Sequence, residues 1–132
     1  MSAITHRITR SWSRGSESIP STETVTGSGE NNRNVDVPGG ETVEVDIDFV
    51  AENLKLFYAH SNQTVQLLTN TNTVETADDA LDIPANRAID WTPSSGLANP
   101  FTADVESIFL VNDGETDAVV RIRSLVEAVV EA

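Results

Sequence analysis

The carboxylates between two apolar stretches near the end of the chain have the spacing that most resembles a site for chemistry. Asp113, Glu115 and Asp117 stand at alternate positions, as the first three ligands of a calcium-binding loop do. Such a loop also needs glycine at its sixth position and glutamate at its twelfth, where this chain has alanine and serine. Asp113-Gly114 favours a tight turn, because both residues tolerate a positive φ. We therefore expect 113–117 to form a hairpin turn between two strands, with a cation site as the alternative.

The other groups that could do chemistry are scattered along the chain. Asp78, Asp79 and Asp82 lie in a polar stretch that predicts a solvated loop, with a metal site in 78–82 as the alternative. His6 and His60 are far apart, and the sequence contains neither a G-x-S-x-G nucleophile motif nor a phosphate-binding loop. The absence of cysteine excludes disulfides, cysteine-ligated zinc and a thiol nucleophile. We expect no enzymatic activity, no metal and no cofactor.

Charge divides the 132-residue chain into two unlike parts. Residues 1–14 contain three arginines and no acid, a charge of +3, and residues 15–132 carry −16. An acidic body repels nucleic acid phosphates and anionic membranes. No apolar run approaches the roughly 20 residues of a membrane span. We therefore expect neither nucleic acid nor a membrane as a partner.

Trp12 stands between Arg10 and Arg14 in a segment with few other apolar residues. Arginine and tryptophan are residue types that anchor protein interfaces. We therefore expect a partner-binding arm that contacts a capsid or a neighbouring protomer through Arg7, Arg10, Trp12 and Arg14. The alternative is an edge strand that folds onto the chain's own acidic body.

Residues 15–34 are rich in Ser, Thr, Gly and Glu and poor in large apolar side chains. Such a composition contributes little to a core, so we expect an extended segment with at most one short strand, near 22–26. The predicted organisation is an arm and extended segment over 1–34, followed by a folded domain over 35–132.

The folded part shows the two-residue period of β-strands. Between 42 and 49, four apolar residues alternate with Thr, Glu and Asp, as in a half-buried strand. Further strands are expected at 54–61, 64–70, up to Trp91, at 104–112, and at 118–125 paired with 104–112. The end, 125–132, fits a helix and a strand equally well. About eight short strands with frequent turns predict an all-β fold, a β-sandwich or jelly-roll-like body with an extended N-terminal arm.

Several short motifs in the second half resemble a group of small tailed-bacteriophage virion proteins. The motifs are Ser61-Asn62-Gln63-Thr64-Val65, Trp91 before a loop, Asn99-Pro100-Phe101-Thr102-Ala103-Asp104-Val105, Val111-Asn112 and Val120-Arg121-Ile122-Arg123. The resemblance covers about residues 42–125. It implies a capsid decoration, or cement, protein: β-rich, a homotrimer, located on the outer capsid surface of the virion, and clamping neighbouring copies of the major capsid protein.

A different class of function remains as the alternative. The same all-β body would suit a phage tail or lectin-like binding module that recognises a cell-surface ligand. Sugar-binding modules present exposed aromatic platforms, and this chain has only two Trp, one Tyr and four Phe. The expected function is therefore the structural one.

Overall fold

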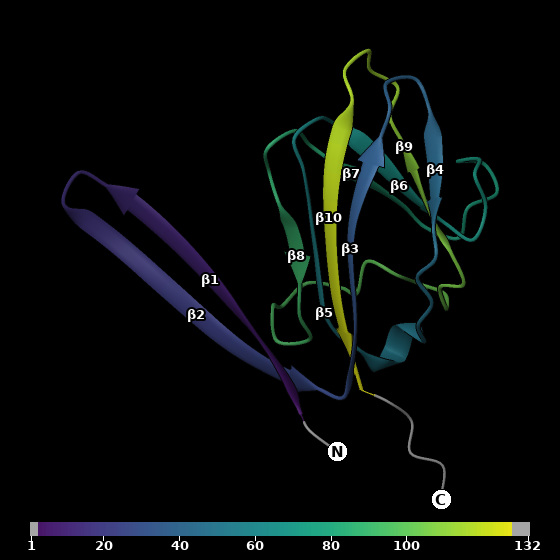
Figure 1. Ribbon diagram of the computed structural model, residues 1–132. Helices are drawn as coiled ribbons and strands as arrows, with labels where there is room; N and C mark the ends of the chain where they lie inside the picture. The colour runs from purple at the N-terminus through teal and green to yellow at the C-terminus, as the bar shows by residue number, and fades with distance from the viewer. Residues whose placement is uncertain (1–2, 128–132) are drawn as a thin grey trace, which may run out of the picture.

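The computed structural model describes residues 3–127, and strands dominate this part of the chain (Figure 1). Ten strands and one short 3-10 turn, Ala51–Asn53, make up its regular structure. The all-β prediction is therefore confirmed. Among these residues there is no helix long and apolar enough to cross a bilayer.

Eight of the strands form two antiparallel four-stranded sheets that pack as a sandwich. The first sheet has the order β3 (Gly29–Val37), β10 (Ala118–Val126), β5 (Leu54–Ser61), β8 (Ile89–Trp91). The second has the order β4 (Thr42–Val45), β9 (Ile108–Val111), β6 (Val65–Thr69), β7 (Ala80–Ile83). Apart from β6–β7, every connection within the sandwich crosses from one sheet to the other.

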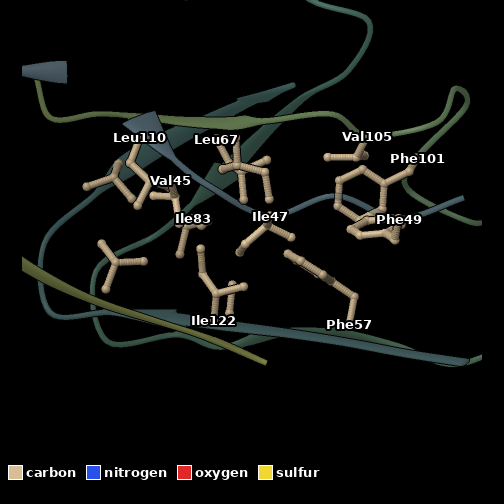
Figure 2. Packing of buried hydrophobic residues seen from close by; sticks show 14 of the residues in the cluster. Val45, Ile47, Phe49, Phe57, Leu67, Ile83, Phe101, Val105, Leu110 and Ile122 are labelled. Atoms are coloured by element: carbon tan, nitrogen blue, oxygen red, sulfur yellow. The ribbon is translucent and has the colours of Figure 1, made fainter. Parts of the chain in front are cut away.

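Apolar side chains from both sheets fill the space between them (Figure 2). The predicted alternation at 42–49 is confirmed, because Val45, Ile47 and Phe49 are buried and their polar neighbours are exposed. Phe101 packs edge-to-face against Phe49 and Phe57, with ring centroids 5.2 and 4.8 Å apart. Each such aromatic pair contributes about 0.5–1.5 kcal/mol beyond its buried area. The three rings therefore join segments that lie far apart in the sequence.

The expected hairpin at 113–117 is wrong. β9 lies between β4 and β6 in one sheet, whereas β10 lies between β3 and β5 in the other. The loop that joins β9 to β10 therefore crosses from one sheet to the other. Asp113-Gly114 is a local turn signal, and it does not distinguish a turn within one sheet from a crossing between two. The strand expected at 104–112 is also shorter, since only an isolated bridge between Phe49 and Val105 precedes β9.

Buried Asn112 organises this crossing. Its Nδ2 donates hydrogen bonds to the carbonyl oxygens of Val37 (3.0 Å) and Thr116 (2.8 Å). Its Oδ1 accepts one from the backbone N–H of Gly114 (3.0 Å). One side chain thereby satisfies backbone groups from β3 and from both halves of the loop.

The N-terminal segments form a long β-hairpin, which corrects the expected extended arm. β1 (Ile4–Arg14) pairs along its whole length with β2 (Glu17–Gly27) around Gly15, whose φ is 60°. The segment lacks core residues, but Thr and Val favour strands and Thr–Thr pairs stabilise neighbouring strands. β3 begins at Gly29, so the sandwich starts before residue 35, the expected boundary.

At the other end, Leu125 and Val126 complete β10. Residues 128–132, which include most of the segment that fits a helix or a strand, lie outside the described residues.

Replacing Asn112 with aspartate should destabilise the protein. The carboxylate would place an acceptor, and a charge, against two carbonyl oxygens that now accept hydrogen bonds. A buried polar group without a partner costs about 1–3 kcal/mol, and a charged one more. We expect urea denaturation to give a free energy of unfolding lower by about 3 kcal/mol. The exposed neighbour Asp113→Asn is the control and should change stability by less than about 0.5 kcal/mol. Equal stability of the two variants would contradict the role assigned to Asn112.

Candidate interaction surface on the N-terminal hairpin

The β1–β2 hairpin starts at one end of the sandwich, and its turn projects away from it (Figure 1). Near its base, the residues of β1 from Ile4 to Arg10 alternate between half-buried and exposed. Every residue from 11 to 22 is exposed. We call residues 11–22 the overhang. The hairpin therefore has a docked base and a free end.

The docked base covers part of the outer face of the first sheet. Leu56 is buried although its neighbour Phe57 points into the core between the sheets. Leu56 and Tyr58 instead line a cavity of about 500 Å³ together with His6 and Ile8 of the hairpin. The hairpin thus shields apolar surface that β5 would otherwise expose.

Side chains directly opposite one another in an antiparallel pair lie on the same face. One face of the hairpin, which we call the body-side face, carries the pairs His6–Val25, Ile8–Glu23, Arg10–Ser21, Trp12–Ile19 and Arg14–Glu17. The opposite face carries Arg7 and Pro20 among Ser and Thr residues. Trp12 and Ile19 continue the body-side face into the overhang, where they are 49% and 59% exposed.

Arg10 and Glu23 fasten the hairpin to the sandwich, and we call their contacts the anchor cluster. Arg10 Nε donates to Asp90 Oδ1 (2.9 Å), its Nη2 donates to the same oxygen, and its Nη1 lies 3.6 Å from Glu23 Oε1. Glu23 accepts hydrogen bonds from Thr92 Oγ1 (2.9 Å) and from Ser94 Oγ. The cluster connects β1 and β2 to β8 and to the loop that follows it.

Contacts between the hairpin and the sandwich lower the pKa of two carboxyl groups, Glu23 in β2 and Glu30 in β3. The hydrogen bond from Ser94 lowers the pKa of Glu23, with smaller contributions from Thr92 and Arg10 that together outweigh the effect of burial. The hydrogen bond with His6, whose Nε2 is 2.6 Å from Glu30 Oε2, lowers the pKa of Glu30. Docking of the hairpin therefore favours the ionised carboxylates.

The four residues expected to bind a partner do not form one surface. Arg10 is held by the protein's own Asp90, as in the alternative of a strand folded onto the acidic body. Arg7 lies on the opposite face, and only Trp12 and Arg14 stand in the overhang. The sequence analysis missed Ile19, because only the pairing of β1 with β2 places it beside Trp12.

Three of the six acidic residues considered for cation binding form hydrogen bonds within or between loops. Asp79 accepts two hydrogen bonds from Thr102, both of 2.8 Å. Asp78 accepts one from Asn70 Nδ2 (2.6 Å), and Asp117 one from the backbone N–H of Gly39 (3.0 Å). Within residues 3–127, no three His, Cys, Asp or Glu side chains are grouped so as to hold a metal ion.

A second surface feature lies on the open side of the sandwich, between the edge strands β7 and β8. A groove of about 300 Å³ is lined mainly by apolar residues, among them Phe57, Leu81, Ile89, Trp91, Leu97 and Pro100. We call it the β7–β8 groove. Trp91 is 9% exposed and its Nε1 donates to the Leu97 carbonyl oxygen (2.9 Å), so the predicted core or rim position is confirmed. Leu97 itself is 69% exposed.

Comparisons with protein family models, with curated proteins and with solved structures find no match for this chain. The functional interpretation therefore depends on the hairpin, its anchor cluster and the groove.

Replacing Arg10 with alanine should loosen the hairpin and leave the sandwich folded. The variant loses the contacts to Asp90 and Glu23, which are partly exposed and therefore individually weak. We expect hydrogen–deuterium exchange in 4–10 and 21–27 to become about 2- to 5-fold faster, with exchange in β10 unchanged. Arg14→Ala in the exposed overhang is the matched control. Equal exchange in the two variants would show that the anchor cluster does not hold the hairpin.

Acidification should also release the hairpin. Because docking lowers the pKa of Glu23, its stabilising effect is complete above the ordinary pKa of 4.5 and is lost as the pH falls through the lower pKa of the docked state. Exchange of the hairpin amides, corrected for intrinsic rates and compared with β10, should therefore accelerate between neutral pH and about pH 3. Glu23→Gln should reduce this dependence and Glu17→Gln should preserve it. If Glu23→Gln preserved the pH dependence of exchange and Glu17→Gln reduced it, Glu23 would be excluded as the titrating contact.

Proposed function

We propose that this chain is a structural virion protein that decorates the outer surface of a tailed-phage capsid and clamps neighbouring major capsid subunits. The observation that carries the proposal is the projecting hairpin. Its overhang extends well beyond the folded sandwich, and every residue of the overhang is exposed. A rigid body with a projecting strand pair suits a protein that bridges subunits of a shell.

The order of the strands supports the finer proposal that the body is a jelly roll. The orders β3-β10-β5-β8 and β4-β9-β6-β7 place the first and last strands of the sandwich side by side, and nearly every connection crosses between the sheets. Jelly rolls consist of eight strands in two sheets and occur in viral capsid proteins and in lectins. The fold is thus compatible with the proposed function and with the alternative of a cell-surface binding module.

The hairpin offers a physical means of clamping. Within the described residues β1 and β2 pair only with each other, so each presents an outer edge of unpaired backbone groups. Such an edge adds readily to a strand of another protein. Arg7 and the Ser and Thr residues of the opposite face stand beside these edges. Many copies on one shell, whether single or as the expected homotrimer, would make modest single contacts collectively strong.

A shortened hairpin tests the proposal. Residues 11–20 are replaced by Asn-Gly, which joins Arg10 to its partner Ser21 through a favoured two-residue turn. The sandwich and the anchor cluster stay intact, since the removed residues are exposed. We expect the complete protein to rebind virions stripped of it, and the shortened protein to bind at least about tenfold more weakly.

The control keeps the full length and replaces only Gly15-Ser16 with Asn-Gly. Equal rebinding by the shortened protein and the control would overturn the role of the overhang. Failure of the complete protein to bind any capsid surface, together with specific binding to cell-surface glycans, would favour the alternative function.

A further inference from the structure

We infer that the Trp12–Ile19 pair of one copy docks in the β7–β8 groove of a second copy of this chain. The inference names a partner for the body-side face and does not depend on the capsid proposal. The edges and the opposite face of the hairpin, which that proposal uses, remain free in this contact.

The overhang needs a covering surface that its own chain does not supply. A two-stranded ribbon is at best marginally stable in water without a third strand or a packed face. The body-side face packs against the sandwich at its base, and Trp12 and Ile19 extend the same face outward. The turn end of the hairpin stands away from the sandwich (Figure 1), and Trp12 and Ile19 remain largely uncovered by their own chain.

The β7–β8 groove has the size and lining to receive this pair. Its volume of about 300 Å³ lies at the lower end of the range for binding pockets, roughly 300–1,000 Å³. Its aromatic and aliphatic walls suit a tryptophan, which is enriched among interface residues that fill such pockets. Leu97 stands exposed at the groove. The contact would therefore cover three of the six large apolar side chains that the described surface exposes.

Charge favours this contact over others between two copies. The chain carries −13, so most pairs of surfaces repel each other. The overhang contains one arginine, Arg14, and one acid, Glu17, and is neutral. Asp82 and Asp90 line the groove, and Asp82 is exposed. Arg14 shares the body-side face with Trp12, so the docking face carries a cation, and the groove offers the exposed carboxylate of Asp82, since Asp90 is already paired with Arg10.

The two surfaces differ, so the contact is head-to-tail. Each copy donates one overhang and offers one groove, and such an arrangement closes into a ring when the rotation between copies allows it. The anchor cluster fixes the direction of the overhang, and with it the position of the next copy.

Light scattering on the purified full-length protein tests the inference. We expect a mass above the 14.2 kDa of one chain. The arm variant Trp12→Ser/Ile19→Thr and the groove variant Leu97→Asp should each be monomers. Ser13→Asp, on the opposite face of the overhang, and Val74→Asp, an exposed apolar residue in a loop, are the matched controls and should keep the wild-type mass. All substituted side chains are largely exposed, and circular dichroism verifies that each variant is folded.

A mixture of the two variants identifies the head-to-tail arrangement. The groove variant supplies an intact overhang and the arm variant an intact groove, so a 1:1 complex of twice the monomer mass should form. Pairing of two overhangs through Trp12 would yield no such complex. A wild-type protein that stays monomeric up to about 1 mM, an arm variant that assembles as wild type does, or a mixture without a 1:1 complex would each overturn the inference. None of these results depends on capsid rebinding, so the two proposals fail separately.

Discussion

The alternation of side chains along an extended strand is the constraint on which both parts of this protein depend. In the sandwich it places one set of apolar residues between the sheets and leaves acids such as Glu44 and Asp46 in water. In the hairpin it separates a face of Ser and Thr from a face that carries Trp12, Ile19 and the anchor cluster. A shift of one residue in the β1–β2 pairing would separate these residues, so the register creates the surface.

The anchor cluster sets the direction in which the paired strands leave the sandwich. Arg10 and Glu23 lie on opposite strands of the hairpin, and their contacts reach β8 and the loop after it. Two strands fastened at neighbouring points cannot rotate about either one alone, which fixes the angle at which the overhang leaves the sandwich. Each ion pair is weak because it is partly exposed, so the rigidity comes from several contacts together with the burial of Leu56.

Local pattern predicted the all-β class, the alternation at 42–49 and the buried position of Trp91. It failed where the outcome depends on residues far apart in the sequence. Asp113-Gly114 has the composition of a hairpin turn, yet β9 and β10 belong to different sheets because each has other partners. The basic, tryptophan-containing segment was correctly singled out, but its division into anchor, opposite face and overhang depends on β2. The surface position of Ile19 could not be predicted from its neighbours Ser, Pro and Glu. Only the pairing of β1 with β2 places it opposite Trp12.

The distribution of charge bears on which contacts the exposed apolar pair can make. An apolar patch on a neutral protein favours nonspecific association. A strongly negative body instead repels other copies of itself in most orientations. The overhang is neutral and extends away from that body, so it can approach a partner with less repulsion than the acidic parts of the sandwich. Its apolar pair then discriminates among surfaces by shape, and the acids around it exclude the rest. In the proposed contact, Trp12 and Ile19 would thus supply affinity and recognition by shape, and the carboxylates of the sandwich would add selectivity by repelling other pairings.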